Sequence, residues 1–328
     1  MQYNFCTLFD KNYCTRGLAL YHSLLQQANH FTLWVLCMDD LVYDVLTKLK
    51  LPQVELIQLS ELEDDELRQV KTTRTAVEYC WTLTPSLPLY ILTHHPELDH
   101  ITYLDADTYF FSSPQPLYDE WANQSILIVS HNYAPRFKSK VAESGIYNVE
   151  FLIFRNDTNG LECLHWWRER CNEWCYFRLE DGKLGDQLYL NDWPTRFRGM
   201  IVAQHLGGGV APWNIERFRI HERNGQVYID GKLIIFFHYH AFKWYSDKMY
   251  EPLLGYYYCP PVVRQLIYQP YATALCQALQ RIQKVVPTFH EGFTTITAWQ
   301  RLKRHLILTM MNQPPFNWLY QRWKSSAV

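Results

Sequence analysis

Hydrophobic and polar positions in the N-terminal part of the chain follow two alternating periods. Short runs rich in β-branched and aromatic residues predict strands at residues 3–9, 31–38 and 54–59, and longer amphipathic runs predict helices at 16–27 and 41–49. This β-α-β-α-β order predicts crossover helices and a largely parallel sheet. Ligands of such sheets bind beyond the carboxyl ends of the strands. Motifs at those strand ends are therefore the first candidates for a functional site.

The same patterns continue through the middle of the chain. They predict strands at 100–104, 126–129 and 151–154, and helices at about 157–177 and 184–193. We therefore expect an α/β fold with a central sheet flanked by helices.

A hairpin is predicted farther along the chain, because Asn224-Gly225 and Asp230-Gly231 are turn signals between β-rich runs. Its last run, residues 233–237, leads into His238. Beyond about residue 260 the helical, basic and aromatic segments show no catalytic spacing. We therefore expect a main domain at 1–258 and a helical C-terminal appendage at 259–328.

Charge and cysteine content narrow the class of protein. The formal net charge of −2 excludes the broad positive field that nonspecific nucleic-acid binding needs. Nine cysteines, an odd number without a secretory signal, predict free thiols in a reducing compartment. No stretch approaches the apolar length of a membrane span. These features predict a cytoplasmic protein that does not bind nucleic acid.

The triplet Asp105-Ala106-Asp107 is the first candidate for chemistry. Two carboxylates on the same side of an extended segment can hold a divalent cation against the phosphates of a nucleotide sugar. The spacing alone decides little, because roughly one such triplet is expected by chance in a chain of this composition. Its position after an apolar strand is more specific. The alternative is a solvated acidic turn.

A second candidate follows the first predicted strand. The carboxylate of Asp10 can accept the imide N–H of uracil, and the ring of Tyr13 can stack on the base. Alternatively, Asp10 caps the helix that follows. The spacing favours neither interpretation.

Taken in chain order, the motifs resemble those of a known family. They are the segment 3–13, Tyr103-Leu104-Asp105-Ala106-Asp107, Tyr147-Asn148, Gly185-Asp186-Gln187 with Asn191, and His238-Tyr239-His240-Ala241-Phe242-Lys243-Trp244. Over residues 3–245 this order resembles the retaining glycosyltransferases of family 8, which include glycogenin and bacterial lipopolysaccharide galactosyltransferases. The resemblance implies a GT-A fold and the transfer of a hexose from a uridine-diphosphate sugar, dependent on Mn²⁺ or Mg²⁺. The acceptor would be a glycan, a lipid or a protein.

The resemblance also implies roles for individual residues. Asp105, Asp107 and His238 would bind the metal, and Asp186 and Gln187 would act at the donor sugar. The remaining donor-binding positions would be Thr7, Asp10, Tyr13, Asp105, Asn148 and Lys243. Lys243 would contact the diphosphate. With retention of configuration, a phosphate oxygen could take the acceptor proton, so no dedicated base is required. A polar helix start is the alternative for Asp186 and Gln187.

Several positions depart from the family pattern, and one departure is the missing proline between Lys243 and Trp244. Ala241 replaces a glycine, Glu150 places a carboxylate near the sugar pocket, and Ser86 lies near where an arginine is expected. These departures keep a second interpretation open, a nucleotide-sugar-binding protein without turnover. A hydrolase is disfavoured because no G-x-S-x-G elbow accompanies the glycine-rich run after His205.

Two further expectations concern His205 and the C-terminus. His205 matches the family's metal-histidine spacing more literally than His238, but no lysine follows it at the expected position. We therefore expect His238 to be the ligand. The basic and aromatic segment 299–324 predicts peripheral attachment to an anionic membrane, with a docked helix pair as the alternative.

Overall fold

The computed structural model describes residues 2–246, 249–252 and 259–295. Its strands are β1 (Tyr3–Phe9), β2 (Phe31–Cys37), β3 (Val54–Gln58), β4 (His100–Leu104), β5 (Thr108–Phe110), β6 (Ile126–Ser130), β7 (Tyr147–Arg155), β8 (Met200–Val202), β9 (Ile220–Arg223), β10 (Gln226–Ile229), β11 (Lys232–Leu233), β12 (Phe236–His238), β13 (Lys243–Ser246) and β14 (Met249–Glu251). Its helices are α1 (Cys14–Gln27), α2 (Asp40–Leu49), α3 (Leu59–Leu62), α4 (Asp65–Lys71), α5 (Ala76–Leu83), α6 (Ser86–His94), α7 (Gln115–Trp121), α8 (Lys140–Ser144), α9 (Thr158–Glu173), α10 (Trp193–Arg196), α11 (Pro261–Val263) and α12 (Gln269–Val285). The described part also contains four short helical turns. Three are 3₁₀ turns, η1 (Pro135–Phe137), η2 (Leu188–Asp192) and η3 (Ile215–Arg217), and one is a π turn, η4 (Arg264–Tyr268).

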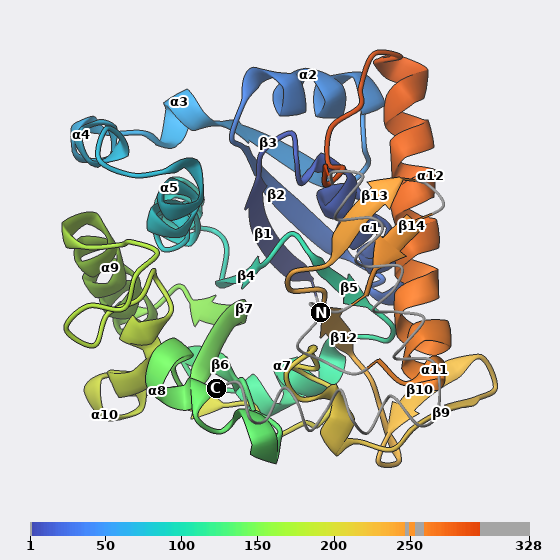
Figure 1. The fold of residues 1–328 in the computed structure, drawn as a ribbon. Helices are drawn as coiled ribbons and strands as arrows, with labels where there is room; N and C mark the ends of the chain where they lie inside the picture. Colours follow the sequence, from blue (N-terminus) through green and yellow to red (C-terminus); the bar gives the residue numbers. More distant parts are fainter. Residues whose placement is uncertain (1, 247–248, 253–258, 296–328) are drawn as a thin grey trace.

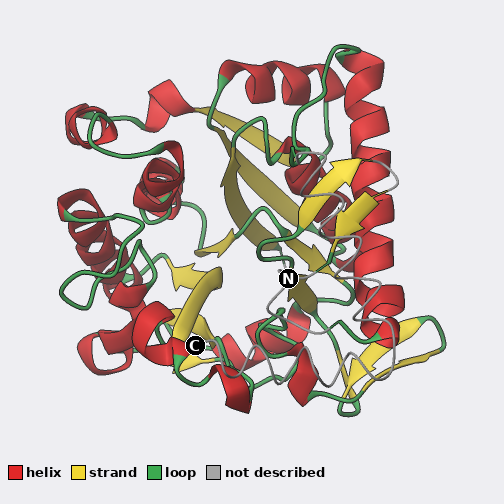
Figure 2. Ribbon diagram, viewed as in Figure 1, coloured by secondary structure: helices red, strands yellow, loops and turns green. Residues whose placement is uncertain are grey.

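A seven-stranded mixed sheet in the order β3-β2-β1-β4-β7-β6-β8 forms the centre (Figure 1). Strands β1 to β4 pair in parallel, whereas β7 runs antiparallel to both β4 and β6. The ribbon coloured by secondary structure shows helices around this sheet (Figure 2). The predicted α/β class with a helix-flanked sheet is confirmed.

The sequence pattern predicted several regular elements closely, but it did not predict α4, α5 and α6. Strands β1 and β4 have the predicted bounds, and the turns at Asn224-Gly225 and Asp230-Gly231 have the positive φ angles of tight hairpins. Local capping sets other boundaries: the side chains of Asp39 and Asp157 accept backbone N–H groups at the starts of α2 and α9.

Strand β7 is longer than the strand predicted at 151–154, and two other predicted elements differ in kind from the structure. The helix expected at 184–193 is replaced by η2 and α10, which start only after Gln187. Contacts with distant residues hold the chain before them, since the backbone carbonyl oxygen of Asp186 accepts the indole N–H of Trp167 and the side chain of Gln187 accepts from Asn148. The single strand expected at 233–237 is split: β11 pairs with β10, and β12 pairs with β5.

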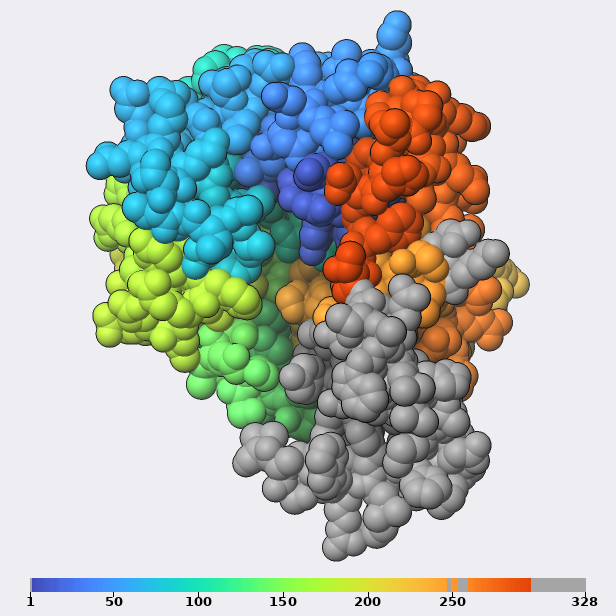
Figure 3. All heavy atoms as spheres, turned by 45° about the horizontal axis from the view of Figure 1, so that its top comes forward, coloured from blue at the N-terminus to red at the C-terminus, as the bar shows by residue number. Residues whose placement is uncertain are grey.

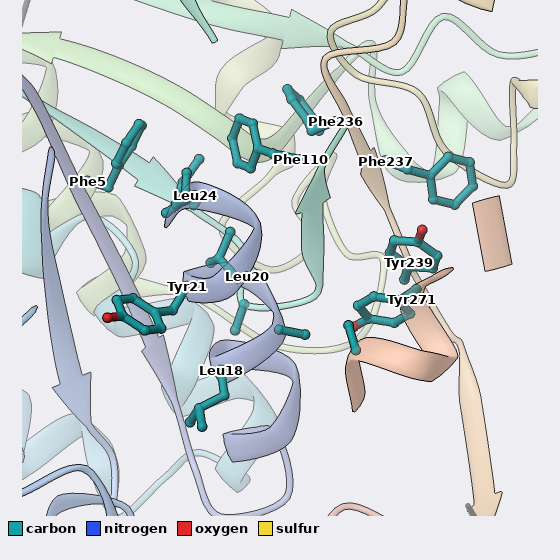
Figure 4. Packing of buried hydrophobic residues seen from close by; sticks show 14 of the residues in the cluster. Phe5, Leu18, Leu20, Tyr21, Leu24, Phe110, Phe236, Phe237, Tyr239 and Tyr271 are labelled. Atoms are coloured by element: carbon teal, nitrogen blue, oxygen red, sulfur yellow. The ribbon is translucent and has the colours of Figure 1, made fainter. Parts of the chain in front are cut away.

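Two hydrophobic clusters pack on the chain's sheet and helices. One joins β1 and β2 to α1, α2, β12 and α12, and Figure 4 shows Leu20 and Leu24 of α1 within it near Phe5 and Phe110. The other joins the sheet to α5, α6 and α9. The ring of Tyr239, one residue after β12, stacks on Tyr271 of α12 at 3.6 Å between centroids. This stack secures the chain beside His238.

The helix α12 lies against α1 along one side of the molecule (Figure 1). In the described part of the chain, no helix combines the length and hydropathy that crossing a bilayer requires. The membrane-binding segment predicted at 299–324 lies outside the described residues.

Candidate active site

The carboxylates of Asp105 and Asp107 lie in a turn between β4 and β5. The backbone N–H and the hydroxyl of Thr108 both donate to the carbonyl oxygen of Asp105, at 3.1 and 2.8 Å, and close this turn. The expected extended segment is therefore wrong, because these local hydrogen bonds bend the chain directly after β4.

The strand pair β5-β12 brings His238 to this turn. In the antiparallel register His238 faces Thr108, and the N–H of Tyr239 donates to the carbonyl oxygen of Asp107 at 2.9 Å. Nε2 of His238 lies 3.1 Å from Oδ1 of Asp107 and 3.7 Å from Oδ2 of Asp105. Residues from two distant parts of the chain thus converge at the end of β4.

The composition of this cluster fits a divalent cation. One ligand atom from each of Asp105, Asp107 and His238 lies within 4.8 Å of the others, and within the described residues no other group of three such side chains does so. Two carboxylates and an imidazole nitrogen suit Mn²⁺ or Mg²⁺. Ligands at about 2.1 Å from an octahedral ion lie about 3 Å apart, close to the shortest contact here.

Burial and neighbouring charges shift the pKa values of Asp105, Asp107 and His238. Burial lowers the pKa of His238, but the carboxylates of Asp107 and Glu150 outweigh burial and hold that pKa well above its usual value. Burial raises the pKa of Asp105 to about 7, and attraction to His238 offsets only part of the rise. For Asp107 the contact with His238 outweighs burial, so its pKa is lowered. A bound cation would replace the imidazolium proton among these carboxylates.

Glu150 of β7 completes the cluster from the other side of the ring. Its side chain has no exposed surface, and its Oε2 lies 2.5 Å from Nδ1 of His238. Sequence reasoning placed this carboxylate near the sugar pocket and missed its contact with the histidine. The available signal was a charge within an apolar strand, since a buried charge requires a partner.

The side chains of Asn148 and Gln187 contact each other, and Asn148 also binds the backbone of Glu150. Nδ2 of Asn148 donates to Oε1 of Gln187 at 2.9 Å and lies 3.0 Å from Nε2 of His131. The amide nitrogen of Gln187 donates to the carbonyl oxygen of Ser144 at 2.7 Å.

His131, which sequence reasoning missed, belongs to this amide network. It is buried, and burial lowers its pKa to about 3, with the neighbouring His238 and His240 adding to the effect. A neutral ring leaves Nε2 free to accept the hydrogen bond from Asn148.

Asp186, the neighbour of Gln187 in the chain, is buried. Its backbone carbonyl oxygen accepts the indole N–H of Trp167 at 2.9 Å, and its Oδ2 has no hydrogen-bond partner in the structure. Burial raises its pKa to about 7, a rise to which the charge of Asp105 also contributes. One carboxylate oxygen of Asp186 thus accepts no hydrogen bond from the protein.

The loop after β1 carries the predicted base-binding residues. Oδ1 of Asp10 accepts the N–H groups of Asn12 and Tyr13, at 2.9 and 3.2 Å. These bonds close the turn before α1, which begins at Cys14 and has no side-chain cap, so the capping alternative for Asp10 is wrong. The ring of Tyr13 is 41% exposed and available for stacking, whereas Thr7 is buried within β1.

Arg16 links this loop to the segment after His238 and was not predicted. Its guanidinium lies 4.5 Å from the centre of the Tyr13 ring and donates to the carbonyl oxygens of Asn12 and Phe242, at 3.0 and 3.3 Å. The side chain is buried. The structure therefore joins two segments that lie far apart in the sequence.

Lys243 and His205 lie apart from the carboxylate cluster. Lys243 opens β13 opposite Glu251, and within the described residues no ion pair joins it to Asp105 or Asp107. Nδ1 of His205 accepts the N–H of Gly207 at 3.1 Å, and Lys232 and Glu120 are its charged neighbours. Of the two histidines, only His238 reaches the cluster.

The surface is indented where the segments carrying these residues meet. Figure 3 shows the hollow between the N-terminal residues in blue, the helices in cyan and the segment near residue 240 in orange. A site at this edge matches the position expected beyond the carboxyl ends of β1 and β4.

Comparison with known proteins places the chain in a family. It is 31% identical over 293 residues to the uncharacterized protein YfnD of Bacillus subtilis strain 168, covering 89% of this chain and 94% of that protein. It is 30% identical over 298 residues to the uncharacterized protein YfnF of the same organism, covering 89% and 97%. The chain belongs to the family of these two proteins. No protein-family model matches it.

Solved structures of similar shape include glycosyltransferases. The glycosyltransferase GlyE of Streptococcus pneumoniae TIGR4 aligns over 87% of this chain and 64% of its own, with a TM-score of 0.49 and 12% identity. The galactosyltransferase LgtC, in complex with donor and acceptor sugar analogues, aligns over 92% and 99%, with a TM-score of 0.48 and 12% identity. At such identities the activity has to be inferred from this chain's own side chains.

Proposed function

We propose that the chain is a metal-dependent glycosyltransferase of the GT-A type that transfers a hexose from a uridine-diphosphate sugar with retention of configuration. The observation that supports this most is the convergence of Asp105, Asp107 and His238 at the end of β4. The amide pair Asn148-Gln187 and the buried Asp186 adjoin it, as a sugar pocket requires.

In this proposal Asp105, Asp107 and His238 hold Mn²⁺ or Mg²⁺. When bound, the cation stabilises negative charge on the leaving diphosphate. Tyr13 stacks on the base, and Asp10 accepts the imide N–H. Thr7 completes the donor site from β1.

The remaining residues orient the sugar and the diphosphate. Asp186, with one oxygen lacking a protein donor, accepts a sugar hydroxyl, and Gln187 lies under the reacting carbon, held by its bonds to Asn148 and Ser144. Lys243, at the start of β13, neutralises the diphosphate. A glycan, lipid or protein hydroxyl then attacks on the face that the diphosphate leaves.

We propose the same division of the chain as its pattern predicts, a catalytic domain at 1–258 followed by the appendage at 259–328. Peripheral membrane attachment through 299–324 remains part of this proposal. Flotation of the full chain and of a chain truncated after Ile296 with anionic liposomes tests it, and equal flotation would contradict it.

A panel of nucleotide sugars tests the function. The protein is incubated with each donor and Mn²⁺, and release of the free nucleotide is measured alongside binding by isothermal titration. We expect release from a uridine-diphosphate hexose and tighter binding of uridine diphosphate than of guanosine diphosphate. Tighter guanosine binding would overturn the base assignment. Donor uptake without any release would instead favour the silent binding protein suggested by Ala241, Glu150 and Ser86.

A further inference from the structure

The buried carboxylate of Glu150 faces the ring nitrogen of His238 that points away from Asp105 and Asp107. Nδ1 of His238 lies 2.5 Å from Oε2 of Glu150, whereas Nε2 faces the two aspartates. The two nitrogens of an imidazole point in divergent directions. A cation held on Nε2 therefore cannot also be held by Glu150, and Glu150 does not belong to the ligand set.

The contact sets the orientation of the ring. A carboxylate accepts the Nδ1–H, so the lone pair of the neutral ring is left on Nε2, where it faces the metal cluster. Carboxylates that bind the second nitrogen of a ligating histidine fix its tautomer and make it a better ligand. His238 and Glu150 are both buried, so water does not compete for this hydrogen bond.

Backbone contacts hold Glu150 itself in place. Its carbonyl oxygen accepts the N–H of Asp105 at 3.2 Å, and its N–H donates to Oδ1 of Asn148 at 2.8 Å. One residue of β7 thus touches a metal-binding aspartate, the metal-binding histidine and a residue of the sugar pocket. Its Oε1 has no hydrogen-bond partner in the structure. Burying a carboxylate with one unpaired oxygen is costly, and a stability role alone does not account for it.

We propose that Glu150 is a positioning residue that orients His238 for metal binding. This inference rests on the proposed function only through the metal site that it shares. Glu150 departs from the glycine of the family that the motifs resemble, so the arrangement is a property of this chain.

Titration with Mn²⁺, followed by electron paramagnetic resonance of the free ion in the presence and absence of uridine diphosphate, tests the proposal. Glu150→Gln keeps the size of the side chain and removes its charge, and we expect it to weaken Mn²⁺ binding about 10-fold to 100-fold. Glu150→Asp retracts the charge by one methylene and should give an intermediate loss. Glu78→Gln is the matched control, because Glu78 is a buried glutamate on α5 that binds the backbone N–H groups of Thr75 and Phe177 and no residue of the cluster. Its Mn²⁺ affinity should equal that of the wild type.

The outcomes distinguish failure of the proposed metal site from failure of the positioning role of Glu150. Wild-type protein that binds no Mn²⁺ would overturn the metal site and the proposed function together. Wild-type binding that is lost in Asp107→Asn but unchanged in both Glu150 variants would overturn the positioning role alone. A purely structural role predicts a lower melting temperature with an unchanged Mn²⁺ affinity of the folded fraction, which circular dichroism alongside the titration detects.

Discussion

Replacing His131 by glutamine should make the stability of the protein less sensitive to acid. His131 is 2% exposed, and burial lowers its pKa from 6.5 to about 3. Above pH 6.5 the ring is neutral in both the folded and the unfolded chain. As the pH falls below that value, the unfolded chain binds a proton that the folded chain does not bind, so stability is lost progressively until the pH reaches about 3.

The size of the effect follows from the shift. At pH 5, about 1.5 units below the unfolded pKa, the loss amounts to about 2 kcal/mol, because one pKa unit corresponds to about 1.4 kcal/mol. Glutamine is the suitable replacement, since its Oε1 can occupy the position of Nε2 and accept the hydrogen bond from Asn148. Contacts of the ring with Tyr133 and Trp213 are lost at every pH, so only the difference between two pH values is informative.

Urea denaturation at pH 7.5 and pH 5, followed by tryptophan fluorescence, measures that difference. The wild type should lose about 2 kcal/mol more than His131→Gln between the two conditions. His221→Gln serves as the control, because His221 is exposed, whereas His131 is buried. Equal losses in the wild type and His131→Gln would show that His131 is not held neutral by burial, and the reasoning would fail.

Two other substitutions test the packing that supports the site. Gly160→Ala should destabilise the protein by about 1–3 kcal/mol in urea denaturation, because the added Cβ would lie 2.2 Å from the backbone oxygen of Arg155. Unchanged stability would contradict this contact. Asp39→Ala should destabilise the protein by about 1 kcal/mol in the same measurement, because the carboxylate of Asp39 accepts the N–H groups of Lys11 and of Val42 at the start of α2. A loss of stability below a few tenths of a kcal/mol would argue against the cap.

The sequence predicts the elements whose side chains repeat regularly. Strands β1 and β4 are buried along their whole length, and their bounds agree with the pattern. The segment 184–193 could not be assigned correctly, because what decides its conformation is distant in sequence. Trp167 on α9 binds the backbone of Asp186, and Asn148 on β7 binds Gln187.

The metal-binding residues were predictable because their motifs follow a recognisable order along the chain. Order and chemistry selected Asp105, Asp107 and His238, and the structure brings these three together. The role of Glu150 was not readable, because it depends on the pairing of β7 with β4 and of β12 with β5, two registers that no local pattern specifies. Nor was His131 readable, since it meets Asn148 only through the pairing of β6 with β7.

Donor turnover by two histidine variants shows which histidine supports metal-dependent activity. The rate of Mn²⁺-dependent nucleotide release from a uridine-diphosphate hexose is measured for the wild type, His238→Ala and His205→Ala, with circular dichroism confirming that each is folded. We expect His238→Ala to abolish the metal-dependent rate, because His238 supplies the nitrogen of the cluster. His205→Ala should retain most of the wild-type rate. Near-normal metal-dependent turnover in His238→Ala, together with its loss in His205→Ala, would contradict the assignment.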